Sequence, residues 1–221
     1  MIPPEQSADF VCAMEDVLDL YHEPYDPKRP QVCFDEGTKQ LFDEVQVPLP
    51  MTPGQPQRYD YEYVRKGTAN LFMFFEPLQG WRHVKVTAQR TMIDYAHCLK
   101  DLVDIYYPAA DCIRIVHDNL NTHKPASLYA AFPPEEARRI LAKLEFHYTP
   151  KHGSWLNMAE IELNVLARQC LDRRIGEQDL LAQEIAAWEA ERNQRGATTK
   201  WQFTTADARI RLHRLYPSLD T

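Results

Sequence analysis

An α/β domain with a mixed five-stranded sheet is the fold class that three observations on the sequence predict. Five short segments have the apolar or alternating pattern of strands. An alternating stretch at 59–64 is not counted among them, because Arg65-Lys66-Gly67 interrupts it. The second and third strands are separated only by a turn at 77–80, which predicts an antiparallel hairpin. Amphipathic helical patterns separate the later strands, as they do in α/β folds. We expect the strands at 32–35, 70–75, 82–87, 112–117 and 144–148.

Helices are expected to flank this sheet, and extra C-terminal helices follow its last strand. An amphipathic pattern at 8–21 leads into a proline-rich connector at 23–30. We therefore divide the chain into an N-terminal helix and linker, 1–30, and a main domain with a C-terminal helical extension, 31–221. Helices are expected at 8–21, 91–107, 124–143 with a break at Pro133-Pro134, 156–173, 177–195 and 205–215.

Composition excludes several classes of protein. No apolar run approaches the ~20 residues that span a bilayer and the start is unlike a signal peptide, so we expect a cytoplasmic protein with no membrane partner. The five cysteines form no CxxC pair, which favours buried thiols over disulfides or a zinc site. Seven scattered glycines argue against Rossmann and P-loop enzymes. The net charge of −7 argues against a DNA partner, unless basic residues cluster or the main DNA-binding part lies elsewhere.

Three acidic residues stand where such a fold brings side chains together. Asp35 and Asp118 each follow an apolar strand, and Gly37 marks a turn after the first. Glu160 lies early in a helix at the edge of the stripe that we expect to be buried, and Glu162 falls on its solvent side. The expected stripe is Ala159, Leu163, Ala167 and Cys170. Three adjacent carboxylates need a compensating cation, and Mg²⁺ prefers oxygen ligands, so the pattern predicts metal-assisted phosphodiester cleavage or transfer.

Each of these residues also has an ordinary structural explanation. An acid or asparagine after a strand is most often a turn or cap residue, which applies to both aspartates and to Asn119. His123 is compatible with a cap on the following helix, and His117 with a hydrogen-bonded core histidine. Spacing alone therefore leaves the metal site as one hypothesis among others.

Two longer motifs carry a family resemblance. The segments His117-Asp-Asn-Leu-Asn-Thr-His123 and Tyr148-Thr-Pro-Lys-His-Gly-Ser-Trp-Leu-Asn-Met-Ala-Glu160 resemble the DDE catalytic core of mariner-superfamily transposases. Cys33-Phe-Asp-Glu36 is similar to the first catalytic strand of that family. The bacterial insertion-sequence branch is the most similar, and the resemblance runs from about Pro24 to the C-terminus.

The resemblance implies an RNase H-like fold whose main domain, 31–221, is a DDE catalytic domain. By their place in the motifs, Asp35, Asp118 and Glu160 become a catalytic triad that binds two Mg²⁺ or Mn²⁺ ions. The implied reaction is cleavage of double-stranded DNA at transposon ends, followed by attack of the 3′-hydroxyl on target DNA, commonly at TA. A homodimer in the DNA complex and a bacterial, nucleoid-associated location are also implied. The implied supporting residues, around the metals or the DNA, are Asn119, Asn121, His123 and Asn157.

The sequence departs from the family pattern in three respects. Asp118 and Glu160 are farther apart than in eukaryotic members, and 149–158 lacks a second proline. The N-terminal helix-turn-helix that reads the inverted repeats has no counterpart that we find, so we expect a separate or missing DNA-reading region. The remaining domain is then expected to hold DNA weakly and with strong salt dependence, through local basic groups. These groups are Arg168, Arg173, Arg174 and the 209–214 segment.

Three other functions stay open at this point. A different RNase H-like nuclease, of the resolvase type, would cleave DNA but not join strands. A non-catalytic remnant of a transposase would bind DNA or a protein without chemistry. A metabolic α/β enzyme would need a small-molecule pocket, for which the sequence offers no cofactor fingerprint.

Overall fold

A mixed sheet of five strands forms the centre of the computed structural model, which describes residues 6–47, 49–56, 58, 60–120 and 123–218. The strand order is β3-β2-β1-β4-β5. Strands β1, β2 and β3 are antiparallel neighbours, whereas β4 runs parallel to both β1 and β5. The antiparallel hairpin and the mixed sheet are therefore confirmed. The strands are β1 (Gln31–Glu44), β2 (Tyr63–Glu76), β3 (Trp81–Thr87), β4 (Ile113–His117) and β5 (Leu144–Tyr148).

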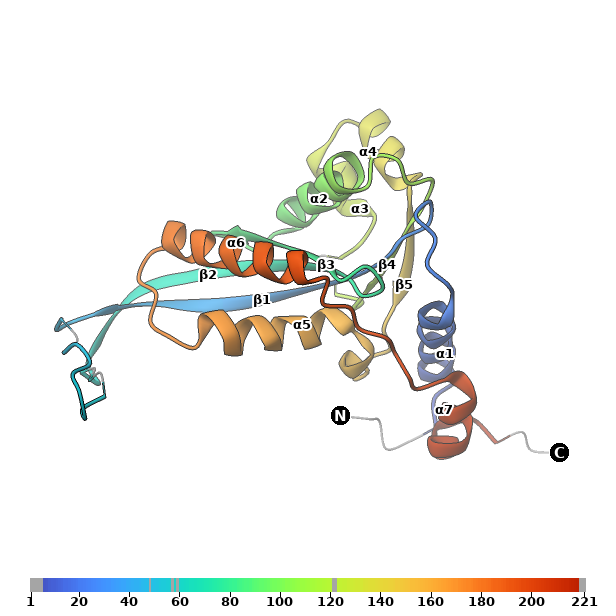
Figure 1. Ribbon diagram of the computed structural model, residues 1–221. Helices are drawn as coiled ribbons and strands as arrows, with labels where there is room; N and C mark the ends of the chain where they lie inside the picture. Colours follow the sequence, from blue (N-terminus) through green and yellow to red (C-terminus); the bar gives the residue numbers. More distant parts are fainter. Residues whose placement is uncertain (1–5, 48, 57, 59, 121–122, 219–221) are drawn as a thin grey trace.

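The first two strands are longer than the sequence pattern predicted. Gly37 is not in a turn but pairs with Leu71 inside the β1–β2 ladder, and the 65–67 run lies within β2. Beyond Leu41 the two strands continue as an arm whose side chains are largely exposed. Figure 1 shows this arm (blue and cyan) leaving the body of the molecule. The ladder satisfies the backbone whatever the polarity of the side chains, so the apolar pattern underestimates the strands.

Helices cover both faces of the sheet and enclose two cores. Helices α2, α3 and α4 cover one face, and α1, α5, α6 and α7 pack into the core of the other (Figure 1). No helix in the described part of the chain is long and apolar enough to cross a membrane. All five cysteines are free, as expected, but only Cys33, Cys98 and Cys170 are buried. The helices are α1 (Ala8–His22), α2 (Met92–Asp101), α3 (Ala126–Ala131), α4 (Pro134–Leu141), α5 (Met158–Leu166), α6 (Gln178–Arg195) and α7 (Thr205–Arg211).

The buried stripe of α5 differs from the expected one. Glu162, expected in solvent, is buried with its carboxylate 2.9 Å from Arg82 Nε of β3 and 2.7 Å from Arg192 Nε of α6. Ala167, expected inside, is exposed. The expectation was wrong for Glu162 and Ala167, whereas Ala159 and Cys170 are buried as expected. Two arginines that lie far away in the sequence compensate the buried acid.

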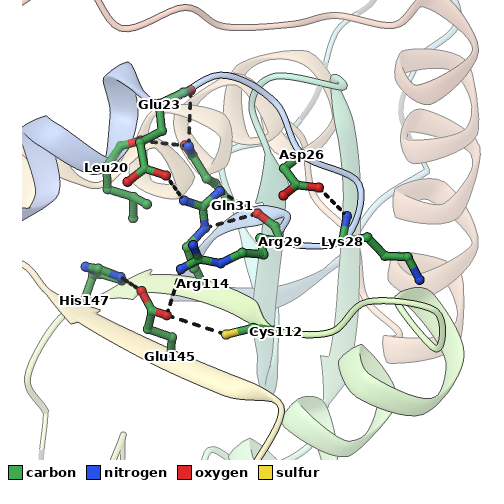
Figure 2. A network of polar contacts seen from close by, with 10 residues as sticks. All are labelled: Leu20, Glu23, Asp26, Lys28, Arg29, Gln31, Cys112, Arg114, Glu145 and His147. Atoms are coloured by element: carbon green, nitrogen blue, oxygen red, sulfur yellow. Dashed lines mark hydrogen bonds and ion pairs between the residues drawn. The ribbon is translucent and has the colours of Figure 1, made fainter.

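A polar network fastens the connector between α1 and β1 to the sheet (Figure 2). Arg114 of β4 is fully buried, pairs with Glu23 and donates from Nε to the carbonyl oxygen of Arg29 at 3.1 Å. Gln31 Nε2 donates to the carbonyl oxygen of Leu20 at 2.7 Å. These bonds hold the end of α1 and the start of β1 beside β4, which fixes the pairing on which the site depends.

Candidate active site

Asp35 and Asp118 lie at the same level on neighbouring strands. The parallel pairing of β1 with β4 ends at Cys33 and Val116, and each aspartate follows two residues later. Asp118 comes directly after the end of β4, as expected. Asp35 does not end its strand, because β1 continues beside β2, where Asp35 pairs with Met73. The two carboxylates are therefore brought together where β4 stops and β1 continues.

Glu160 reaches this place from the first turn of α5. Residues 154–156 form a short 3₁₀ turn, and α5 begins only after Asn157. The side chain of Asn157 accepts from the backbone N–H of Ala159 at 3.1 Å and donates to the carbonyl oxygen of Phe34 at 2.8 Å. An N-cap satisfies a free amide of the helix end, and this one also ties the helix to β1 next to Asp35. Asn157 is therefore a supporting residue through the backbone that it fixes.

The three acids line one cavity of about 280 Å³. It lies between β1, the end of β4 and the start of α5. Its wall also contains Glu36, Thr149, Ser154 and Leu163, none of which the sequence pattern marked as site residues. Glu36 belongs to the Cys33-Phe-Asp-Glu36 motif. Because adjacent residues on a strand normally face opposite sides, the pattern did not predict that Glu36 lines the same cavity as Asp35. The complete lining is Asp35, Glu36, Asp118, Thr149, Ser154, Asn157, Glu160 and Leu163.

Electrostatics in this cavity favour a cation. Burial raises the pKa of Asp35 to about 7, the N–H of Glu36 opposes the rise, and the charges of Asp118 and Glu160 add to it. Glu160 Oε2 is buried and has no hydrogen-bond partner among the described residues. A divalent cation would relieve both features, because it compensates the carboxylate charges and supplies a partner for the buried oxygen. The donor set of three carboxylates fits Mg²⁺ or Mn²⁺.

A second group of possible ligands is less suited to a metal. Atoms of His117, Asp118 and His123 lie within 4.8 Å of one another. Each ring has a partner on Nδ1, since His117 Nδ1 lies 2.7 Å from the carbonyl oxygen of Asp118 and His123 Nδ1 lies 2.6 Å from its Oδ1, while Nε2 of each ring has no hydrogen-bond partner among the described residues. Burial lowers the pKa of His117 to about 4, as suits a core histidine. The carboxylate cavity is therefore the better candidate.

His123 proves to be a partner of Asp118 and not a helix cap. The ring is fully buried, and its Nε2 lies 3.4 Å from Glu36 Oε2. Burial lowers the pKa of His123, but the hydrogen bond to Asp118 and the nearby carboxylate of Glu36 outweigh this effect and raise it to about 9. Asn119 is exposed, and Asn121 lies outside the described residues.

A larger groove of about 910 Å³ adjoins the cavity and shares Asp118, Thr149 and Ser154 with it. Its other walls come from the start of α1 and from the loop after β5, where Lys151 and His152 are exposed. Three of the six arginines expected to contact DNA are instead neutralised: Arg173 pairs with Glu184, Arg174 with Glu44 and Arg209 with Glu15. The basic groups next to the carboxylates are those of the groove.

Comparison with known proteins identifies the type of domain. Residues 30–182 match the model of a family described as DDE superfamily endonuclease. Comparison with functionally curated proteins gives no significant match.

Three solved structures illustrate the structural likeness. The Mos1 mariner paired end complex with Mn is 16% identical with a TM-score of 0.57, over 89% of this chain and 61% of that one. The Mos1 strand transfer complex is 14% identical with a TM-score of 0.59, over 89% and 60%. The paired end complex with Mg is 15% identical with a TM-score of 0.56, over 99% and 66%. The chain thus spans less than two thirds of the Mos1 chains, and the likeness, which is one of fold, confirms the RNase H-like expectation.

Proposed function

The chain belongs to the DDE superfamily endonuclease family, and on this premise we propose that it is the catalytic domain of a transposase, spanning 31–221. The domain would cut DNA at transposon ends and join the freed 3′-hydroxyl to target DNA. The observation that carries the proposal is the convergence of Asp35, Asp118 and Glu160 on one cavity, from two strands and a helix. The buried oxygen of Glu160 without a partner among the described residues supports it, because buried polar atoms normally have a partner and a bound cation would supply one.

The three acids would hold the metal ions in the proposed mechanism. Asp118, with 37% of its side chain exposed, and Asp35, which is mostly buried, would hold two Mg²⁺ or Mn²⁺ ions between them. Glu160 would complete the ligand set from the other side of the cavity. When bound, such ions activate an attacking hydroxyl and stabilise the leaving oxygen of a phosphoryl displacement.

Double-stranded DNA is the proposed substrate, and the groove next to the cavity is the proposed path for the strand. Lys151 and His152 would contact its phosphates, since basic side chains give affinity that does not depend on sequence. The solved Mos1 complexes with a transposon end support a DNA partner. Dimerisation in the DNA complex, insertion at TA, end recognition by a helix-turn-helix region and membership of the bacterial insertion-sequence branch complete the proposal, on the motif resemblance.

The test is nicking of a supercoiled plasmid in Mg²⁺ or Mn²⁺ by the parent, Asp118→Asn and Glu160→Gln. Asp43→Asn is the matched control, because Asp43 lies on β1 like Asp35 but is half exposed on the arm and pairs with Lys66. We expect the parent and the control to nick only with metal, and both triad variants to lose nicking by about a hundredfold or more. Equal activity in all four proteins would contradict the assignment of Asp118 and Glu160 as catalytic residues.

Strand joining separates the transposase from its alternatives. An oligonucleotide with a free 3′-hydroxyl at a transposon end should become joined to plasmid DNA. Cleavage without joining would favour a nuclease of the resolvase type, and metal binding with neither reaction would favour a non-catalytic remnant.

A further inference from the structure

A chain of charged side chains runs from the surface to Asp118. Arg90 NH1 lies 3.0 Å from Glu36 Oε1, and Glu36 Oε2 lies 3.4 Å from His123 Nε2. The other ring nitrogen, Nδ1, lies 2.6 Å from Asp118 Oδ1. The exposed fraction of the side chain falls along this series, from 46% for Arg90 to 5% for Glu36 and 0% for His123.

This series of charged side chains approaches Asp118 from the face of the sheet opposite to Asp35. Position 37 of β1 faces α5, because a Cβ added to Gly37 would meet Leu163 at 3.6 Å. Alternation along the strand then places Asp35 on the α5 face, and Phe34 and Glu36 on the α2 face. The ring of His123 agrees, since its centroid lies 5.2 Å from that of Phe34 and 4.8 Å from that of Tyr95 in α2.

Asp118 therefore connects two environments. One side of its carboxylate is held by a buried ring on the α2 face, and the same residue lines the cavity that it shares with Asp35 and Glu160. The aspartate follows the last residue of β4, where the ladder no longer fixes the backbone. A side chain at such a position needs another constraint if it is to present a ligand in one orientation.

We propose that His123 and Glu36, backed by Arg90, are positioning residues that hold Asp118 in the orientation for binding a divalent metal ion. The inference rests on the proposed function and deepens it, because it assigns the α2 face of the sheet a part in the metal site. Partners of this kind fix the orientation of a ligand, and their loss typically costs about 10-fold to 100-fold in metal affinity. Glu36 has a second task, because its carboxylate lies 3.4 Å from the other ring nitrogen, which is buried and has no hydrogen-bond partner among the described residues.

Binding of Mn²⁺ to the DNA-free chain, measured by titration calorimetry, tests this without relying on catalysis. We expect His123→Ala to weaken Mn²⁺ binding about tenfold or more. His123→Asn should recover much of this loss, because its amide nitrogen stands close to the place of Nδ1 and still donates to Asp118. Glu36→Gln should weaken binding less, because the amide oxygen still accepts from the ring but carries no charge.

His147→Ala is the matched control. His147 of the edge strand β5 likewise lies between two carboxylates, 3.0 Å from Glu145 (Figure 2) and 2.8 Å from Asp16 of α1, and neither carboxylate lines the cavity of the three acids. Its loss should lower thermal stability and leave Mn²⁺ affinity unchanged. A merely structural role of His123 predicts the same for His123→Ala, with a lower melting temperature in EDTA and normal metal affinity.

Asp118→Asn distinguishes the failure of this inference from that of the proposed function. If Asp118→Asn loses Mn²⁺ while His123→Ala and Glu36→Gln bind like the parent, the positioning role is overturned and the transposase proposal stands. If the parent does not bind Mn²⁺, or Asp118→Asn binds it equally well, both fall. Should His123→Ala not fold, the nearly isosteric Glu36→Gln decides, and unchanged affinity in that variant overturns the inference.

Discussion

The side-chain amide of Asn157 donates to the carbonyl oxygen of Phe34 at 2.8 Å, so the first turn of α5 is tied to the middle of the sheet. The same side chain caps α5 through the N–H of Ala159. Because Asp35 follows Phe34 and Glu160 lies in that first turn, one buried amide sets the distance between two members of the proposed triad.

Asn157→Ala should lower both stability and nicking. The change removes a helix cap and leaves the Phe34 carbonyl without its donor, which together cost about 2–4 kcal/mol of unfolding free energy. Asn157→Ser keeps a capping oxygen but not the donor to Phe34, so urea unfolding should place it between Asn157→Ala and the parent. If the two variants were equally unstable, the cap would contribute nothing.

Two glutamates of α5 should respond in opposite ways to neutralisation. Glu162→Gln leaves Arg82, fully buried, and Arg192 without their counter-charge, and should cost about 3–5 kcal/mol in urea unfolding. Glu160→Gln neutralises a half-buried carboxylate, one oxygen of which is buried without a partner among the described residues, so metal-free stability should be unchanged or higher. A large loss of stability in Glu160→Gln would contradict the assignment of Glu160 to a metal site.

Glu76 should make stability fall as the pH rises. The residue is 3% exposed, and burial raises the pKa of its carboxyl above the ordinary 4.5, although the hydroxyl of Tyr107 donates to it and opposes the shift. The unfolded state then loses its proton first, so the stability cost is absent below 4.5 and grows above it. Glu76→Gln should therefore gain stability relative to the parent as the pH rises from about 4 towards neutrality, in parallel urea titrations. A difference that is independent of pH would show that Glu76 does not titrate abnormally.

Added metal should stabilise the fold through the carboxylate cavity. A ligand present at about 100 times its dissociation constant adds about 2.7 kcal/mol. Thermal unfolding of the parent should therefore shift upward in Mn²⁺, and Asp118→Asn should show little shift. An equal shift in Asp43→Asn and the parent, measured in the same series, confirms that the arm takes no part.

Lys151→Ala should weaken DNA binding without a change in Mn²⁺ affinity. Each lost phosphate contact lowers the slope of log K against log salt by about 0.9, and this should appear in titrations of fluorescent duplex DNA at several salt concentrations. Lys66→Ala, on the arm and away from the groove, is the control. Equal slopes for parent and Lys151→Ala would place the DNA elsewhere.

The five strands and the three motifs of the site were predictable because their signals are local. A short apolar run specifies a buried strand, and an acid directly after it marks the end of that strand, as at Asp118. The arm was not predictable in this way. Its side chains are largely exposed and of mixed polarity, and only pairings such as Asp43 with Val64 identify them as strand.

The environments of charged residues were also not predictable from the sequence. Glu162 is buried because Arg82 and Arg192 compensate its charge. The role of His123 depends on Glu36 and Arg90. No pattern of sequence spacing predicts any of these partners. Resemblance selected His123, but the contacts alone distinguish a positioning residue from a helix cap.

The sequence by itself determined which segments form the sheet and which acids were candidates, because hydrophobic periodicity and motif chemistry act over a few residues. Only the tertiary structure decided that Asp35, Asp118 and Glu160 share a cavity, which acid of α5 is buried in an ion pair, and what holds Asp118. The physical reason is that burial and charge compensation depend on groups brought together by folding, and these groups lie far apart along the chain.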